Sequence, residues 1–395
     1  MPYHFDLVID RRSTNSNKWR KYPPDVLPLW VADMDFQAPP AVLAALQSSL
    51  VHGVLGYESP TNRLREVVAE RMQRLYGWQF QPDMVVPVPG VISSFNLAAR
   101  VACQPGEGLL IQPPVYPPFL GVHKNIGLTH QVAPLTKIKD GSRLRFEIDF
   151  DHFEAAIDSG GTKTGMFLLC HPHNPTGQVY DRKTLTRLAD ICLRHGVLIC
   201  SDEIHSELLL DGASHTPLAS LAAEIAARSI TLVSPSKTFN VAGLNCAFAI
   251  ITDKTLHDRY CQEVERQTFH MNSLGLAAAQ AAFSGECDDW LVELNLYLTA
   301  NRDELVEQIS SRLPGISVSV PQATYLAWLD CSDLVASGRI KTSPFQFFLE
   351  KARVALNDGA LFGEGGQGCV RLNFGCPRST MQSALERMQA ALAES

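Results

Sequence analysis

The 395-residue sequence has no surplus of positive charge and no long apolar run. It carries 34 Lys and Arg against 41 Asp and Glu, for a formal net charge of −7. Because nucleic-acid binding requires a basic face, this balance excludes nucleic acid as a main partner. No apolar run approaches the roughly 20 residues of a membrane-spanning helix, and residues 1–6 lack the apolar core of a signal peptide. We therefore expect neither a membrane nor a nucleic acid as partner.

The ten cysteines include no C-x-x-C pair. Several of them stand within apolar runs, as Cys170, Cys200 and Cys246 do. A thiol in such a run behaves as a small hydrophobic side chain. This usage predicts a cytoplasmic protein rather than a secreted one stabilised by disulfides, and we expect no metal site.

The first two thirds of the chain alternate between short apolar runs and helix-like segments. Amphipathic spacing predicts helices over residues 91–103 and 181–195, the second closed by Gly196. Apolar strands separated by helices imply a mostly parallel sheet covered on both faces, and hence an α/β fold. The predicted strands of this sheet are 84–87, 166–170, 197–201, 230–233 and 246–251.

The length is sufficient for two domains. We expect a large α/β domain over residues 51–285, with a break at the sequence Ser-Gly-Glu that ends near residue 286. A long helix over 288–313 and scattered strands then predict a smaller α+β domain over 286–395. Residues 1–50 are expected to form an N-terminal segment that packs with the small domain.

Polar side chains follow three of the predicted strands. Asn174 comes shortly after strand 166–170, and Asp202 ends strand 197–201. Ser234, Ser236 and Lys237 follow strand 230–233. Because ligands in open α/β sheets bind beyond the carboxyl ends of the strands, we expect these side chains to converge on one site.

Each of these residue types meets a need of pyridoxal phosphate (PLP). Lys237 offers an amine for covalent attachment of the aldehyde, and Asp202 offers a carboxylate beside the ring nitrogen. Asn174, with His205 nearby, can donate to the ring oxygen. The phosphate would be held by the hydroxyls of Ser234 and Ser236. The backbone amides at Val91 and Ile92, which open a helix, would also favour an anion.

Each residue taken alone has an ordinary structural reading. A lone lysine is usually a solvated charge, Asp202 could simply cap a helix, and Asn-Pro-Thr-Gly at 174–177 is a turn signal. Their joint order at neighbouring strand ends is what favours a PLP enzyme.

Two further motifs are interpreted as structural. Residues 363–368 satisfy G-x-G-x-x-G, but a strand follows them instead of preceding them, so we expect a flexible turn rather than a dinucleotide site. His171 and His173 have the spacing of a metal pair, yet no nearby Cys or carboxylate completes a ligand set.

The ordered motifs H-N-P-T-G, S-D-E-I-H, S-P-S-K and R-L-N-F-G-C-P-R resemble the class I/II aminotransferase superfamily of PLP fold type I. The segments 27–36, 113–119 and 323–328 further resemble its MalY/PatB branch, the cystathionine β-lyases or cysteine C–S lyases. The resemblance covers essentially the whole chain. It implies the PLP-transferase fold, with a mostly parallel central sheet in the large domain.

The resemblance also implies roles for residues that patterns alone leave open. Tyr116 would stack on the cofactor ring, and Arg371, with Asn174, would bind the substrate's α-carboxylate through a bidentate fork. Tyr57 matches the position from which relatives reach the cofactor phosphate of the other subunit, so a homodimer with a shared site is expected. One position departs from many aminotransferases: Asn245 stands eight residues after the lysine, where they place a phosphate-binding arginine.

Three functions are consistent with these residues. The branch resemblance favours a C–S β-lyase that converts a small sulfur-containing amino acid, such as cystathionine or cysteine, to a thiol, pyruvate and ammonia. Lys237 would then be both the anchor and the general base, assisted by Asp202 and Tyr116. An aminotransferase of the same superfamily is the alternative. The third is a lyase with an additional regulatory binding role.

Overall fold

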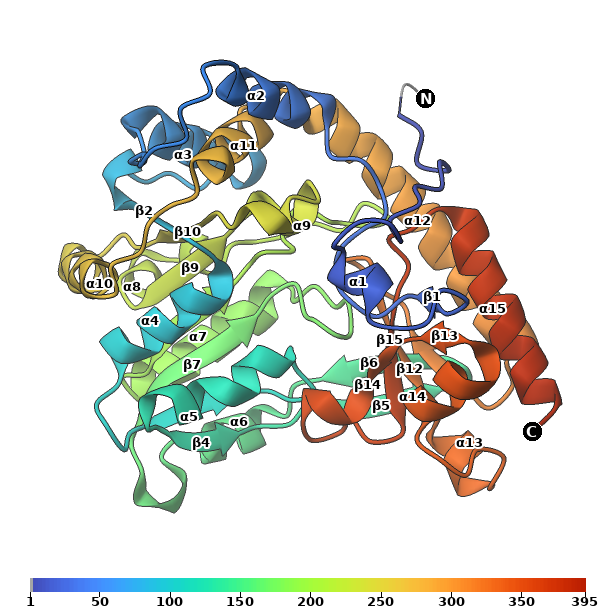
Figure 1. The fold of residues 1–395 in the computed structure, drawn as a ribbon. Helices are drawn as coiled ribbons and strands as arrows, with labels where there is room; N and C mark the ends of the chain where they lie inside the picture. The colour runs from blue at the N-terminus through green and yellow to red at the C-terminus, as the bar shows by residue number, and fades with distance from the viewer. Residues whose placement is uncertain (1–2) are drawn as a thin grey trace.

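The computed structural model describes residues 3–395, so Met1 and Pro2 of the predicted N-terminal segment lie outside it. The centre is a seven-stranded sheet in which β10 runs antiparallel to both of its neighbours, whereas the other neighbouring pairs are parallel (Figure 1). In spatial order its strands are β2 (Val85–Val88), β10 (Ala247–Ile250), β9 (Ser229–Val233), β8 (Leu198–Asp202), β7 (Thr164–Cys170), β3 (Gly108–Ile111) and β4 (Thr129–Val132).

Alternate residues of the central strands enter two separate cores. In β7, Met166 and Leu168 pack with α4 (Val91–Ala102) and α10 (Lys254–Arg266), while Phe167 packs on the opposite face. Helices α6 (Phe150–Ala156), α7 (Arg182–Arg194) and α8 (Ala223–Ala226) cover that second face. The predicted α/β class with a mostly parallel sheet is therefore confirmed, and it explains why these strands are apolar throughout.

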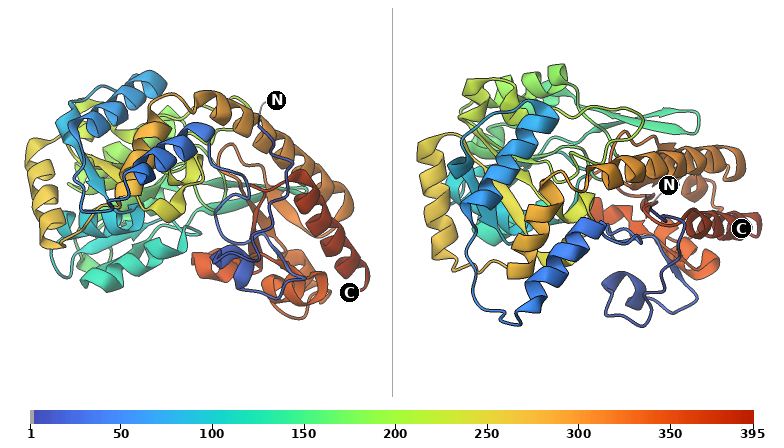
Figure 2. Two further views of the ribbon diagram at one scale, coloured as in Figure 1. Left: turned by 45° about the horizontal axis from the view of Figure 1, so that its top comes forward. Right: turned by 90° about the horizontal axis from the view of Figure 1, so that it is seen from above.

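A second sheet of six strands lies beside the first (Figure 2). Helices α12 (Asp288–Arg312) and α15 (Arg378–Ala393) share its hydrophobic core, and the predicted long helix over 288–313 is confirmed. In order its strands are β14 (Asn357–Asp358), β15 (Cys369–Asn373), β12 (Leu326–Asp330), β11 (Ser317–Ser319), β6 (Arg143–Glu147) and β5 (Thr136–Asp140).

The N-terminal part of the chain contacts two elements that are distant in the sequence. Strand β1 (Leu27–Pro28) pairs in parallel with β13 (Val354–Ala355), and α1 (Asn17–Arg20) precedes it. Helix α2 (Pro40–Val51), in contrast, packs on α11 (Ser273–Phe283). The division of the chain into residues 1–50, 51–285 and 286–395 stays a prediction. Two contacts cross its bounds: α2 packs on α11, and β5 and β6 belong to the second sheet.

The remaining elements are short, apart from α3. They are α3 (Asn62–Tyr76), α5 (Val122–Ile126), α9 (Pro235–Thr238), α13 (Ser332–Ala336), α14 (Pro344–Phe347), the 3₁₀ turns η1 (Pro82–Met84), η2 (Pro117–Gly121), η3 (Ser159–Gly161), η4 (Leu218–Ser220), η5 (Ala242–Leu244) and η7 (Gly359–Phe362), and the π-helical turn η6 (Phe348–Ala352).

Within residues 3–395 no helix has the length and apolarity needed to cross a membrane.

Candidate active site

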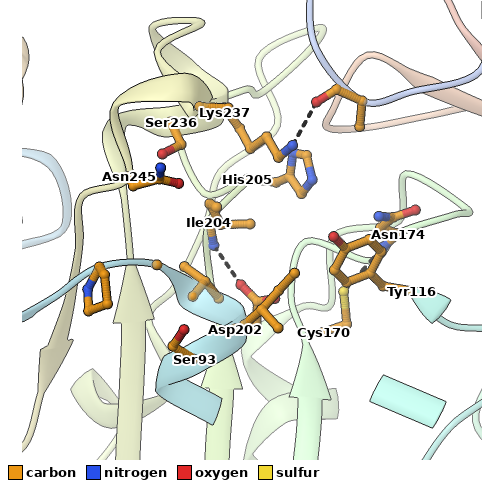
Figure 3. A pocket seen from close by; sticks show the side chains of 16 residues that line it. Ser93, Tyr116, Cys170, Asn174, Asp202, Ile204, His205, Ser236, Lys237 and Asn245 are labelled. Carbon is orange, nitrogen blue, oxygen red and sulfur yellow. Dashed lines mark hydrogen bonds between the residues drawn. The ribbon is translucent and has the colours of Figure 1, made fainter. Parts of the chain in front are cut away.

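The three strand ends named by the sequence meet at one cavity. Asp202 is the last residue of β8, Asn174 follows β7, and Lys237 lies in α9 just beyond β9. These three strands are neighbours in the sheet, which is why their carboxyl ends converge (Figure 3). The cavity is lined by Ala32, Pro89, Gly90, Val91, Ile92, Ser93, Tyr116, Cys170, Asn174, Asp202, Ile204, His205, Ser236, Lys237, Ala242 and Asn245.

Lys237 extends into the cavity without a carboxylate partner. Within residues 3–395, no carboxylate oxygen lies within 4.0 Å of its Nζ, which instead donates to the carbonyl oxygen of Ala32 at 2.6 Å. Burial lowers the pKa of Lys237 to about 8, and the positive charge of Arg371 acts in the same direction. A substantial fraction of the amine is therefore neutral near pH 8, as attack on an aldehyde requires.

Asp202 is a buried carboxylate with little compensation. It is 4% exposed, and its Oδ1 accepts a hydrogen bond from the amide of Ile204 at 3.2 Å. Burial raises its pKa to about 7 despite that bond and the nearby Lys237. A protonated ring nitrogen placed beside this carboxylate would restore its charged form, since an opposite charge favours ionisation.

Arg371, on β15, is fully buried and has only neutral partners among residues 3–395. Its guanidinium donates to Asn174 Oδ1 at 3.0 Å, to the Trp30 carbonyl at 2.9 Å and to Asn357 Oδ1 at 2.5 Å, while Nε has no partner. Burial lowers its pKa to about 10. A buried cation without an anion is costly, so this geometry fits an anionic ligand.

Asn174 joins the two ends of the site. Its Oδ1 is taken by Arg371, which leaves Nδ2 as a donor toward the cavity. Tyr116 lines the same cavity and is partly buried. Burial raises the pKa of its phenol, so the hydroxyl stays protonated. His205 is also buried, has a depressed pKa through burial and leaves Nδ1 without a partner among residues 3–395.

The opposite end of the cavity presents neutral donors. Helix α4 begins there, and the backbone amides of Val91, Ile92 and Ser93 form its N-terminal end, which favours anions. Ser236 and Asn245 line the same cavity. Ser93 was not predicted, although its position in the first turn of the predicted helix could have indicated it.

Ser234 does not line the cavity but lies next to Ser236, which does. Its hydroxyl donates to the Cys246 carbonyl at 2.7 Å and accepts from the amide of Ser236 at 3.1 Å. It thereby caps α9, the short helix that carries Lys237. Its predicted contact with phosphate stays a prediction, while its capping role fixes the position of Ser236.

Tyr57 lies away from this cavity. Its side chain is 91% exposed, and its ring lies against His270 with 5.0 Å between centroids. Its predicted role in a second subunit's site stays a prediction.

The motifs interpreted as structural lie outside the cavity. The glycines of 363–368 form a turn before β15, with positive φ at Gly363, Gly365 and Gly368. The ring of His171 stacks on those of His215 and Tyr180. Within residues 3–395, no group of three or more His, Cys, Asp or Glu side chains is arranged to hold a metal ion.

These groups fit PLP. The orphaned guanidinium of Arg371 and the destabilised carboxylate of Asp202 call for charges that an amino acid and a pyridinium ring carry. The amine of Lys237 suits an aldehyde, and the donors at α4 suit a phosphate. Sequence reasoning missed Ala32, which meets Lys237 across 205 residues of chain, and Asn357, which meets Arg371 through strand pairing. It also missed Cys170 and Ser93, although they lie at the end of a predicted strand and in the first turn of a predicted helix.

The shifted pKa of Lys237 predicts a pH-dependent stability effect. Below pH 8 the amine is charged in both the folded and unfolded chain, so the folded state carries the full cost of burial; this cost shrinks as pH rises from about 8 to 10.5. We expect Lys237→Met to raise the melting temperature of the cofactor-free protein by a few degrees at pH 7, and progressively less toward pH 10.5. Calorimetry across this range measures the effect.

The matched control is Lys254→Met, because the side chain of Lys254 is 80% exposed. It is expected to leave the melting temperature nearly unchanged at every pH. A gain in Lys237→Met that did not vary with pH would contradict the shifted pKa.

Comparisons with known proteins agree with the site. Residues 24–388 match the model of the family "Aminotransferase class I and II". Cystathionine beta-lyase PatB of Bacillus subtilis is 38% identical, over 98% of this chain and 100% of its own length. Protein MalY of Escherichia coli is 32% identical, over 97% of each chain.

Solved structures lead to the same family. The crystal structure of OvoB is 40% identical, with a TM-score of 0.91 and complete coverage of both chains. Cystalysin from Treponema denticola, which contains a pyridoxal 5'-phosphate cofactor, is 31% identical with a TM-score of 0.92, again over both whole chains. The fold, the convergent strand ends and these matches together show that the chain belongs to the class I and II aminotransferase family and is similar to its PatB and MalY members.

Proposed function

We propose that this protein is a PLP-dependent C–S β-lyase that splits amino acids of the cystathionine or cysteine type into a thiol, pyruvate and ammonia. The observation that carries the proposal is Arg371, a buried cation without an anion, which shares the site with Lys237 and Asp202. This arrangement suits the α-carboxylate of an amino acid. The lyase chemistry is supported by the full-length similarity to proteins named cystathionine beta-lyase.

The residues of the chain divide the work of holding the cofactor. Lys237 would attach it, and the ionised carboxylate of Asp202 would accept a hydrogen bond from the protonated ring nitrogen. Asn174 Nδ2 would donate to the ring oxygen, with His205 beside it, and Tyr116 would stack on the ring. Ser236, Asn245 and the amides of Val91, Ile92 and Ser93 would hold the phosphate, and Ser234 would support them through the capped turn.

Elimination moves one proton from Cα and breaks one C–S bond, and water then hydrolyses the released three-carbon enamine to pyruvate and ammonia. Bound PLP withdraws electrons from the amino acid's Cα. Arg371 fixes the carboxylate, so that Cα lies near Lys237, and the freed amine of Lys237 removes the Cα proton. The thiolate then leaves from Cβ, since a thiol with a pKa near about 8.5 is a good leaving group.

Aminotransfer is the second candidate, because the family model that matches this chain is the one for class I and II aminotransferases. It uses the same anchor, base and carboxylate site. Asn245, where many aminotransferases place an arginine, favours the lyase. A regulatory role beside the lyase activity is compatible with an intact site, but no contact in the structure points to it.

We place the enzyme in the cytoplasm as a homodimer. Its ten cysteines are all free, and nine of them are buried, which suits a reducing compartment. Apolar side chains that a monomer would leave in water gather on one segment: Val51, Val54, Leu55 and Tyr57 are 86, 69, 63 and 91% exposed. A second copy of this chain would cover them and bring Tyr57 to the phosphate of its partner.

The first test is the reaction. Incubated with cystathionine and PLP, the protein should release free thiol and pyruvate in equal amounts without 2-oxoglutarate. Thiol reagent and lactate dehydrogenase assays measure both products, and Lys237→Ala should abolish both. Glutamate formed from 2-oxoglutarate, with no release of thiol or pyruvate, would establish the aminotransferase instead.

The second test concerns Arg371. Replacing it with Gln removes the only cation proposed for the substrate carboxylate, so kcat/KM should fall on the order of 100-fold, mainly through KM. Arg371→Lys keeps the charge but loses the two parallel hydrogen bonds of a guanidinium, so its kcat/KM should fall less. Arg378→Gln, in the first turn of α15, is the control. An unchanged kcat/KM in Arg371→Gln would refute the assignment.

The third test concerns the shared site. At limiting PLP, Lys237→Ala and Tyr57→Ala should each have low activity. When the two variants are co-expressed, half of the dimers contain one chain of each, and each of these dimers holds one intact site. About one quarter of all sites should then be intact, and the activity should rise accordingly. Activity at limiting PLP and the mass in solution measure this. A mixture no more active than the average of the two variants would show that Tyr57 does not act across subunits.

A further inference from the structure

The segment 29–36, here called the strap, is held from both sides by amide side chains. Asn373, on β15, donates from Nδ2 to the carbonyls of Val31 and Asp33 at 2.6 and 2.7 Å. Asn240, three residues after Lys237, donates to the carbonyl of Met34 at 2.9 Å and accepts from its amide at 3.0 Å. The backbone of the strap is therefore fixed relative to both the lysine and the arginine strand.

A buried ionic cluster anchors the side chains of the strap. Lys18, with a side chain that is 0% exposed, lies 2.6 Å from Asp35, and Arg11 contacts both Asp33 and Asp35 at 3.1 and 2.9 Å. The indole of Trp19 donates to Asp35 at 2.8 Å. Ion pairs as buried as that of Lys18 with Asp35 are retained when they fix a geometry, because they add little net stability.

One carbonyl of the strap faces the base. The oxygen of Ala32 accepts from Lys237 Nζ at 2.6 Å and from the hydroxyl of Tyr325 at 2.9 Å, and Figure 3 shows the amine directed at this oxygen. Tyr325 is 1% exposed and precedes β12. The carbonyl of Trp30, two residues before Ala32, accepts from Arg371.

We propose that Tyr325 is a positioning residue that acts through Ala32: it fixes the Ala32 carbonyl, which holds the Lys237 amine whenever the amine is not bonded to the cofactor. An amine that donates one hydrogen to Ala32 has its lone pair confined to the remaining directions, toward the cavity. Once the amine has taken up a proton, the same carbonyl stabilises the ammonium by a charge-assisted bond. The strap thus assists proton removal without touching the substrate.

The role assigned to Tyr325 rests on the proposed PLP chemistry but not on the release of a thiol. Exchange of the Cα hydrogen of L-alanine with D₂O requires the same proton transfer by Lys237 and no leaving group. NMR of this exchange therefore separates the two ideas. If the wild-type enzyme exchanged the Cα hydrogen of alanine but released no thiol from cystathionine, the proposed lyase function would be wrong, whereas the positioning role of Tyr325 would remain testable by the exchange.

The test compares Tyr325→Phe with Tyr297→Phe in the holoenzyme. Both remove a hydroxyl from a buried ring, since Tyr297 is 6% exposed and bonds Asp6 and the amide of Arg378. We expect Tyr325→Phe to slow alanine exchange about tenfold, the effect of one positioned hydrogen bond. Its alanine affinity and the visible absorption of bound PLP should be unchanged, and Tyr297→Phe should exchange as the wild type does.

Three results would overturn the proposal. Exchange in Tyr325→Phe at the wild-type rate would show that the hydroxyl has no part in proton transfer. Equal slowing in both variants would indicate a general effect of losing a buried hydroxyl. Loss of the cofactor's absorption in Tyr325→Phe would assign Tyr325 to cofactor binding instead.

Discussion

Burial of charge without counter-charge is the constraint on which the site depends. Arg371 and Asp202 are buried and Lys237 is partly buried, and burial opposes the charged form of each, lowering the pKa values of Arg371 and Lys237 and raising that of Asp202. Each group therefore favours a ligand that returns the missing partner: a carboxylate, an aldehyde carbon and a ring N–H. The surrounding scaffold offsets this cost: Arg71 pairs with the buried Glu207 and with the partly exposed Asp288, and one hydrophobic core lies on each face of the sheet.

The part of the site that could be predicted from the sequence is the part set by strand ends. Asn174, Asp202 and Lys237 each follow an apolar run, and parallel strands bring such positions to one edge whatever the rest of the fold does. Ala32 and Asn357 could not be found in this way, because Ala32 accepts from a lysine 205 residues away in the chain and Asn357 meets Arg371 through the pairing of β14 with β15. The phosphate contact of Ser234 stays a prediction, and the structure adds a role that the sequence did not indicate, since its hydroxyl caps the short helix that carries Lys237.

The same distinction holds for the fold. The strands of the central sheet are uniformly apolar and were predictable, whereas β5 and β6 carry Lys and Arg on alternate positions and are mostly exposed. The local sequence pattern therefore predicts this hairpin only weakly, and its position in the sheet depends on the pairing of β6 with β11, which is distant in the chain. The glycines of 363–368 illustrate the reverse case: the pattern was present, but the following strand excluded the site that the pattern suggests.

The strap gives a physical reason why recognition and chemistry are joined in this chain. Trp30 and Ala32, two residues apart, accept from Arg371 and Lys237 respectively, so the carboxylate site and the base are held by one short stretch of backbone. On the proposed role of Tyr325, an amine docked on Ala32 removes the Cα proton but has little freedom to carry it to a second position. Aminotransfer requires that second delivery, whereas loss of a thiolate from Cβ does not. On this proposal, the hydrogen bond that holds the amine at Ala32 favours elimination over aminotransfer.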